Sequence, residues 1–127
     1  MVSKQFFYIS KIVNRFYRKY KGKLVRCVTV SKELSKILTS EGIKNTFVWK
    51  LAGWENKYID SRKMRMIWQE HAWIELKIGK RDYVIDITGP TQFKWLGIDR
   101  PIMGKKTYYN KWDRIKKYNP KNDRPVK

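Results

Sequence analysis

Apolar and aromatic positions recur at steps of three and four within residues 3–20, and most Lys and Arg residues fall between them. This spacing predicts an amphipathic helix with Ser3 as its N-cap and Gly22 at its end. Such a basic helix can also lie on a membrane or an RNA backbone, but we favour a core-facing stripe. The stripe consists of Phe6, Ile9, Val13, Phe16, Tyr17 and Tyr20.

A second helical pattern covers residues 27–42, with Cys27 at its N-terminal end and Gly42 closing it. Residues 45–54 are rich in β-branched and aromatic side chains, which predicts a strand. Residues 55–69 begin polar and charged, so we expect a loop or a short irregular element there. The apolar face of the second helix holds Cys27, Val30 or Ser31, Leu34, Ile37 and Leu38.

Residues 71–88 predict a β-hairpin, because polar and apolar residues alternate on both sides of a two-residue Gly-Lys turn. One face of this hairpin would be apolar. The opposite face would carry His71 opposite Thr88 and Trp73 opposite Asp86. His71 and Asp86 become diagonal neighbours, with backbones roughly 7–8 Å apart. A slip of one residue would mix apolar and polar faces, which favours this register. The expected facing pairs on the apolar side are Ile78–Arg81, Leu76–Tyr83, Ile74–Ile85 and Ala72–Ile87.

The chain predicts one α+β domain of 127 residues. We divide it into an N-terminal amphipathic helix (1–22), a core (24–93) and a basic C-terminal extension (94–127). The extension contains a candidate short helix near 107–118 and a Pro- and Lys-rich end that we expect to be frayed.

Composition narrows the class of protein. A hydrophobic fraction of 42% and an aromatic fraction of 15% indicate a folded domain. No apolar run approaches the roughly eighteen residues that span a bilayer, and the first twenty residues do not resemble a secretory signal. One cysteine cannot form an internal disulfide, so the default location is cytoplasmic.

The net charge of +19 would attract nucleic acid, an anionic membrane or an acidic protein. Lysine dominates the basic residues, alongside abundant Ile, Tyr and Asn, which also fits a codon bias. Both explanations of the charge stay open.

Cys27 and His71 are the only cysteine and histidine of the chain. A cysteine attacks as its thiolate, which a helix N-terminus and a histidine cation both favour, and a carboxylate orients the imidazole. Cys27, His71 and Asp86 are therefore candidates for nucleophile, base and orienting carboxylate, provided that the hairpin approaches the helix end. Each residue alone is more often a core thiol, a satisfied imidazole or a cap. One histidine and one cysteine do not make a zinc site, and we expect no metal or cofactor.

The stretch HAWIELKIGKRDYVIDIT resembles the His-and-Asp hairpin of transglutaminase-like, papain-fold cysteine enzymes. The shared features are His-Ala-Trp, a hydrophobic-Glu strand, a turn, and Asp-x-Thr fifteen residues after the histidine (86 − 71). Upstream, Cys27 opens a CxxxSxxLxxxLxxxGI pattern that matches more loosely. The chain is also similar to lasso-peptide leader peptidases and papain-fold effector domains. The resemblance covers about residues 24–93 and implies a papain-like fold with a Cys27–His71–Asp86 triad.

The chain departs from these families around the cysteine, where LVRCVT stands in place of Gly-x-Cys-Trp, and Lys21 where papain-type peptidases have an oxyanion-hole Gln. The backbone N–H of Cys27 is one candidate oxyanion donor. A second donor could come from any of Gln5, Asn14, Gln69 and Gln92. Candidate cleft residues are Trp49, Trp54, Trp73, Thr88 and Gln92.

The expected function is a cysteine-dependent hydrolase of a peptide or side-chain amide, with deamidation and transamidation as variants. Its substrate would be a protein or peptide, acidic if the basic surface docks it. The alternatives are a basic nucleic-acid-binding module, which rests on the net charge and on aromatic residues among lysines in 105–118, and a papain-fold protein that only binds a partner.

Overall fold

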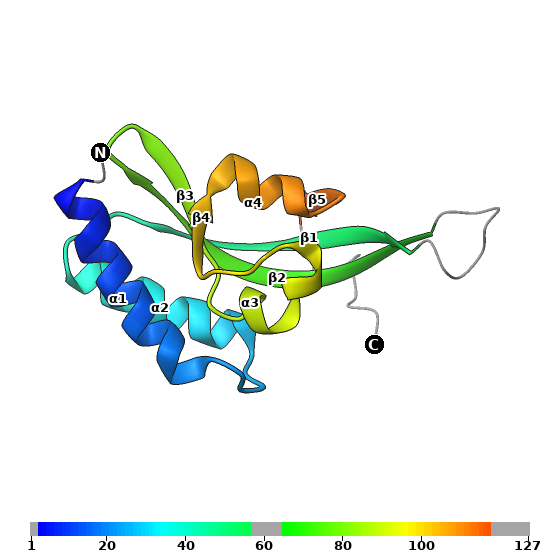
Figure 1. The fold of residues 1–127 in the computed structure, drawn as a ribbon, viewed down its shortest axis with the longest axis horizontal. Coiled ribbons are helices and arrows are strands. Elements are labelled where there is room, and N and C mark those ends of the chain that lie inside the picture. The colour runs from blue at the N-terminus through cyan, green and yellow to red at the C-terminus, as the bar shows by residue number, and fades with distance from the viewer. Residues whose placement is uncertain (1–2, 57–64, 118–127) are drawn as a thin grey trace.

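The computed structural model describes residues 3–56 and 65–117 and shows an α+β fold, in which helices pack on a five-stranded antiparallel sheet of order β4-β3-β2-β1-β5 (Figure 1). The elements are α1 (Lys4–Tyr20), α2 (Cys27–Ser40), β1 (Thr46–Asn56), β2 (Arg65–Ile78), β3 (Arg81–Ile85), α3 (Gly89–Gln92), the 3₁₀ turn η1 (Lys94–Leu96), β4 (Ile102–Gly104), α4 (Lys105–Lys111) and β5 (Arg114–Lys117).

Both faces of the sheet are covered, because the hairpin alternates two apolar sets. One set packs against α1 and α2, and the other lies on the side of α4 (Figure 1). The first cluster includes Ile9, Val13, Leu34, Leu38, Ile74, Leu76, Ile78 and Ile85. The second includes Val48, Ala52, Trp73, Val84, Phe93, Ile98, Met103, Tyr108 and Trp112.

The two predicted helices are confirmed. Ser3 caps α1 by accepting a hydrogen bond from the Phe6 N–H at 3.1 Å, and the apolar stripe of α1 faces the core. Gly22 and Gly42 follow the two helices with φ of 73° and 74°, a left-handed conformation that favours glycine.

The hairpin turn and register are confirmed over the first part of the ladder, where Ile78 faces Arg81 and Ile74 faces Ile85. The prediction that pairing continues to residue 88 was wrong. β3 ends at Ile85, and the Asp86 N–H instead donates to the Pro101 carbonyl at 2.8 Å. Asp86 thus takes its backbone partner from the segment that leads into β4 rather than from β2.

The loop expected over 55–69 was wrong at both of its ends. β1 runs to Asn56 and β2 starts at Arg65, so that the two strands form one long antiparallel ladder. Polar residues can belong to these strand ends because β1 and β2 are each other's cross-strand partner along this stretch. Residues 57–64 lie outside the described part of the chain.

The segment expected as a C-terminal extension contributes β4, α4 and β5 to the fold. The helix predicted near 107–118 was wrong in its bounds, since α4 ends at Lys111. Residues 114–117 instead pair with the free edge of β1, where Ile115 faces Ala52. The predicted fraying of the last residues concerns 118–127, which lie outside the described residues.

Candidate active site

His71 and Asp86 meet inside the protein as the hairpin pattern predicted. His71 Nε2 lies 2.7 Å from Asp86 Oδ2, and both residues are almost completely buried. His71 comes from β2, and Asp86 follows directly after β3. The contact therefore arises across the hairpin, although His71 and Asp86 both lie beyond the paired residues of the β2–β3 ladder.

Three donors hold the Asp86 carboxylate. Besides His71 on Oδ2, the Tyr108 hydroxyl donates to Oδ2 at 2.7 Å and the Gly89 N–H donates to Oδ1 at 2.8 Å. Gly89 leaves the carboxylate room, because a Cβ there would contact Asp86 Oδ2 and come within 2.8 Å of Ile98 Cγ2. A buried carboxylate is stable only when its oxygens are satisfied, so these bonds fix its position.

Cys27 lies at the first position of α2 and is half-buried. One turn later, the Ser31 hydroxyl donates to the Ala72 carbonyl at 3.3 Å, which ties α2 to β2 next to His71. The N-terminal end of α2 has no acidic residue in its first turn and follows Arg26, so its dipole and the guanidinium both favour an anion there.

The charge state of His71 reflects its neighbours. Burial alone lowers its pKa, but the Asp86 carboxylate, through charge and hydrogen bond, and the Cys27 side chain raise it to about 10. An imidazole in this setting is protonated at neutral pH. Its Nδ1 is buried without a hydrogen-bond partner among the described residues, so the nitrogen opposite Asp86 is unoccupied.

Aromatic rings surround the imidazole. The rings of Phe93, Trp112 and Trp73 lie 5.0, 5.9 and 6.0 Å from that of His71, measured between centroids. They exclude water from the His71–Asp86 pair, which strengthens its electrostatic interaction.

A surface cleft of about 400 Å³ opens beside Cys27. Gln69 and Gln92 line it, whereas Gln5 and Asn14 do not, which reduces the candidate oxyanion donors to two glutamines. Glu70 also lines it and was missed in the sequence. The complete lining is Val25, Arg26, Cys27, Val28, Gln69, Glu70 and Gln92.

Of the residues predicted for the cleft, only Gln92 lines it. Trp73 is fully buried beneath His71, and Thr88 is buried at the start of α3. Trp54 packs against Phe93 and Trp112. Trp49, in β1, is likewise absent from the cleft lining. Burial in the core explains the absence of Trp73, whereas Trp49 and Trp54 are half-buried at positions outside this cleft.

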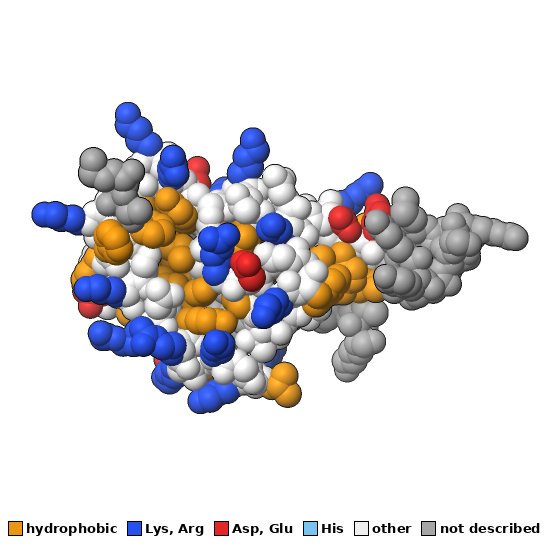
Figure 2. All heavy atoms as spheres, viewed as in Figure 1, with side chains coloured by type: hydrophobic (Ala, Val, Ile, Leu, Met, Phe, Trp, Pro, Cys, Tyr) orange, Lys and Arg blue, Asp and Glu red, His pale blue; other side chains and the backbone are white. Residues whose placement is uncertain are grey.

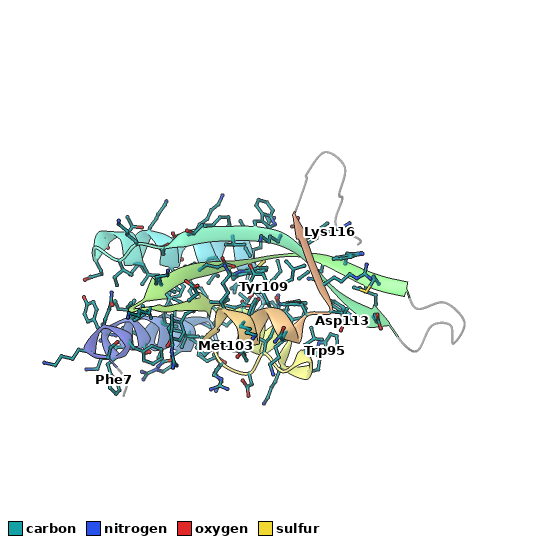
Figure 3. All side chains as sticks on the ribbon, turned by 90° about the horizontal axis from the view of Figure 1, so that it is seen from above. Phe7, Trp95, Met103, Tyr109, Asp113 and Lys116 are labelled. Atoms are coloured by element: carbon teal, nitrogen blue, oxygen red, sulfur yellow. The ribbon has the colours of Figure 1, made fainter. Side chains whose placement is uncertain are left out.

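Glu75, a further residue of the hairpin motif, belongs to a separate polar cluster with Tyr109 of α4, which is labelled in Figure 3. It accepts hydrogen bonds from Trp73 Nε1 at 2.9 Å and from the Tyr109 hydroxyl, and Lys105 Nζ lies 3.1 Å away. Burial raises the pKa of Glu75, but these three partners outweigh it and lower the pKa overall. These three partners hold the Glu75 carboxylate in place.

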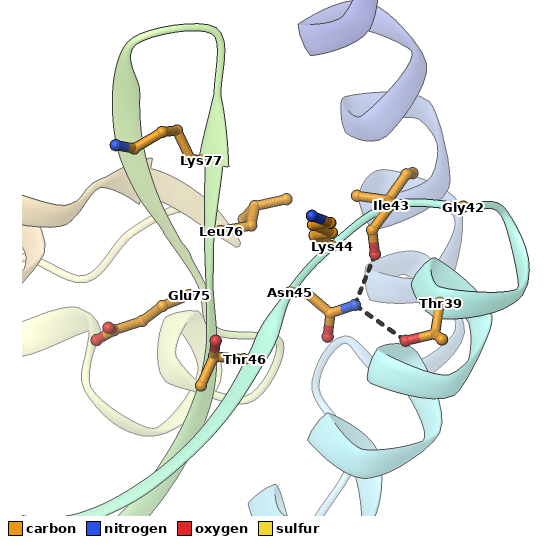
Figure 4. A pocket seen from close by; sticks show the side chains of 9 residues that line it. All are labelled: Thr39, Gly42, Ile43, Lys44, Asn45, Thr46, Glu75, Leu76 and Lys77. Atoms are coloured by element: carbon orange, nitrogen blue, oxygen red, sulfur yellow. Dashed lines mark hydrogen bonds between the residues drawn. The ribbon is translucent and has the colours of Figure 1, made fainter.

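A larger hollow of about 640 Å³ lies at the other end of α2, between its C-terminus and strands β1 and β2 (Figure 4). Its amide residue Asn45 already donates to the Thr39 hydroxyl and the Ile43 carbonyl. The hollow holds neither the thiol nor the imidazole, so size alone does not identify the site.

Within residues 3–56 and 65–117, no three His, Cys, Asp or Glu side chains gather as a metal site would require, and no helix is both long and apolar enough for a bilayer. No family model, curated protein or solved structure matches the chain. The site is therefore interpreted from its own geometry.

Tyr108 is the site residue that sequence reasoning missed most completely. It lies 22 positions after Asp86, and nothing in the local pattern separates it from Tyr109. The glycine of the Ile-Thr-Gly stretch was a detectable signal, since a glycine three residues after a candidate carboxylate suggests close backbone approach.

Proposed function

We propose that this protein is a cysteine-dependent amide hydrolase of papain-like, transglutaminase-like architecture, with Cys27 as nucleophile, His71 as acid and base, and Asp86 as orienting carboxylate. One observation carries the proposal. The buried imidazole has Asp86 on Nε2 and no partner on Nδ1, and the Cys27 side chain acts on it from the end of α2 beside an open cleft.

The chemistry follows from these positions. His71 holds the proton and Cys27 reacts as the thiolate, whose sulfur attacks the amide carbonyl carbon to form a C–S bond. His71 then donates the proton to the leaving nitrogen as the C–N bond breaks, which leaves a thioester on Cys27. Water attacks this thioester while His71 takes its proton. The C–S bond breaks to return the Cys27 thiolate, the carboxylic acid leaves, and His71 keeps the proton that it took from water.

The negative charge that develops on the carbonyl oxygen needs donors. The Cys27 N–H, at the start of α2, supplies one. Gln92 is the better second candidate, because its Oε1 is buried without a partner among the described residues, which leaves its NH₂ end for the cleft. Gln69 is exposed and less fixed.

Acyl transfer from p-nitrophenyl acetate tests the proposal without knowledge of the natural substrate. We expect a burst of p-nitrophenol and an acetyl group on Cys27, found by peptide mass spectrometry, and neither in Cys27→Ser or His71→Gln. Circular dichroism verifies that the variants fold. An unmodified Cys27, or equal acetylation in folded His71→Gln, would contradict the proposal and leave a papain-fold protein that only binds.

The nucleic-acid alternative relied on aromatic residues among the lysines of 105–118, and the structure weakens that support. Tyr108 and Trp112, two of the aromatic residues expected to stack on bases, are buried in the core. Lys105 pairs with Glu75 and lies over the Tyr109 ring. That alternative then depends on net charge, which is tested below.

A further inference from the structure

Residues 3–26 contain eight Lys and Arg residues and no Asp or Glu, and all eight are exposed. We call this set the basic stripe. It consists of Lys4, Lys11, Arg15, Arg18, Lys19, Lys21, Lys23 and Arg26.

The α1 part of the basic stripe lies on one helical face. Lys4, Lys11 and Arg15 are spaced by seven and four residues, which stacks them along the helix opposite the buried residues Ile9 and Val13. Figure 2 shows Lys and Arg side chains spread over the side of the molecule where Figure 1 places α1. A helix of seventeen residues makes this a charged track about 25 Å long.

The basic stripe leads to the Cys27 cleft. The Gly22 N–H donates to the Thr91 hydroxyl at 3.2 Å, which holds the loop after α1 next to Gln92 of the cleft. Arg26, the last member of the stripe, itself lines the cleft. The charged track and the candidate nucleophile therefore belong to one continuous surface.

Most of this charge is unbalanced within the protein. Lys19 lies 3.7 Å from Glu33, and no other member of the basic stripe forms an ion pair with a residue of the described ranges. Exposed cations packed along one track repel each other, and a bound polyanion relieves that repulsion.

We propose that the basic stripe docks an acidic segment of a polypeptide substrate whose neutral or basic neighbouring residue enters the Cys27 cleft. This inference rests on the proposed function, because the cleft acts on an amide. Glu70 in the cleft would repel a carboxylate or phosphate there, so the acidic segment must lie on the α1 side of the cleaved bond. Leu24, fully exposed beside Val25, adds an apolar contact suited to a peptide side chain.

Protection of Cys27 from iodoacetamide tests this docking. The probe is a synthetic peptide with a block of Glu and Asp residues followed by a short neutral segment. We expect it to slow alkylation of the native protein at low salt and to lose this effect as salt rises. In Arg15→Glu/Arg18→Glu/Lys21→Glu, the peptide concentration that gives half protection should rise about tenfold or more.

The matched control is Lys36→Glu/Lys44→Glu/Lys106→Glu, which changes the net charge equally at exposed positions off the basic stripe. It should retain protection to within about a factor of three. Equal protection in both triple variants, or by a neutral peptide of the same length, would overturn the docking surface. Tighter binding of a single-stranded oligonucleotide of equal charge would overturn the assignment to a polypeptide.

Failure of the docking surface and failure of the proposed function give different results. Arg15, Arg18 and Lys21 do not line the cleft, so alkylation and p-nitrophenyl acetate turnover without peptide should be unchanged in both triple variants. If acetate turnover is absent while the acidic peptide still protects Cys27, the hydrolase fails and the docking surface stands.

Discussion

The Tyr108 hydroxyl donates a hydrogen bond of 2.7 Å to Asp86 Oδ2, the same oxygen that contacts His71 Nε2. Burial, followed by the Asp86 charge and hydrogen bond, raises the pKa of Tyr108 well above its ordinary value, so the hydroxyl keeps its proton and stays a donor. A residue of α4 thus holds the carboxylate that orients the imidazole of β2.

Tyr108→Phe should remove this bond and keep the ring. We expect a loss of about 1.5–3 kcal/mol in the free energy of unfolding, measured by urea titration, because the bond is to a charged group. The rate of Cys27 alkylation by iodoacetamide, followed against pH, should also change, because Asp86 then holds the imidazole less firmly.

Tyr109→Phe is the matched control, since Tyr109 donates to Glu75 rather than to Asp86. It should lower stability without moving the pH profile of alkylation. If both variants leave that profile unchanged, Tyr108 has only a structural role.

The His71–Asp86 pair predicts a pH dependence of stability. The pKa of His71 is raised from 6.5 to about 10, so the folded state binds a proton more tightly than the unfolded state does. The stability from this pair is complete below about pH 6.5 and is lost as pH rises towards 10.

Native protein and His71→Gln, which keeps a donor but carries no charge, should therefore be compared by urea unfolding across that window. We expect a difference of about 3–5 kcal/mol at its lower end that shrinks towards its upper end. A difference that grows with pH would show that His71 is buried as the neutral imidazole.

Gly89→Ala should displace the Asp86 carboxylate, because the added Cβ would lie 2.6 Å from Asp86 Cγ. We expect a loss of about 1–3 kcal/mol in stability by urea titration, with slower acylation of Cys27. Gly104→Ala is the control, since a Cβ there meets nothing closer than the Thr107 hydroxyl at 3.9 Å. Normal acylation in Gly89→Ala would mean that Asp86 does not need its present position.

Ser31→Ala removes the bond that ties α2 to the Ala72 carbonyl. We expect a loss of about 1 kcal/mol in stability and a lower rate of Cys27 alkylation, because the first turn of α2 is less fixed beside His71. Ser40→Ala, which removes an exposed bond within α2, should change neither measurably. An unchanged alkylation rate in Ser31→Ala would mean that the Ser31–Ala72 bond does not control the reactivity of Cys27.

Local patterns predicted the parts of this site that are close in sequence. The alternation of residues 71–85 and the Gly-Lys turn were sufficient to place His71 and Asp86 on one side of a hairpin, because register follows from the turn and from the side-chain period of two. The same kind of pattern placed Cys27 at the start of α2 through the spacing of Leu34 and Leu38.

Patterns failed where a neighbour distant in sequence decided the outcome. Residues 65–69 follow a polar and charged stretch, yet they form a strand because β1 supplies a partner. Residues 114–117 pair with the other edge of β1 rather than continue a helix. Backbone N–H and C=O groups at a sheet edge pair with whichever segment the fold brings alongside. Local residue preferences do not predict which segment that is.

The sequence by itself determined the two helices, the hairpin, and the meeting of an imidazole with a carboxylate, since all of these depend on short-range periodicity. Only the tertiary structure decided that α2 brings Cys27 to His71, that Tyr108 and Gly89 hold Asp86, and that the basic stripe leads to the cleft. Such contacts join residues up to 69 positions apart, and they form because burial of both sheet faces fixes where each helix packs.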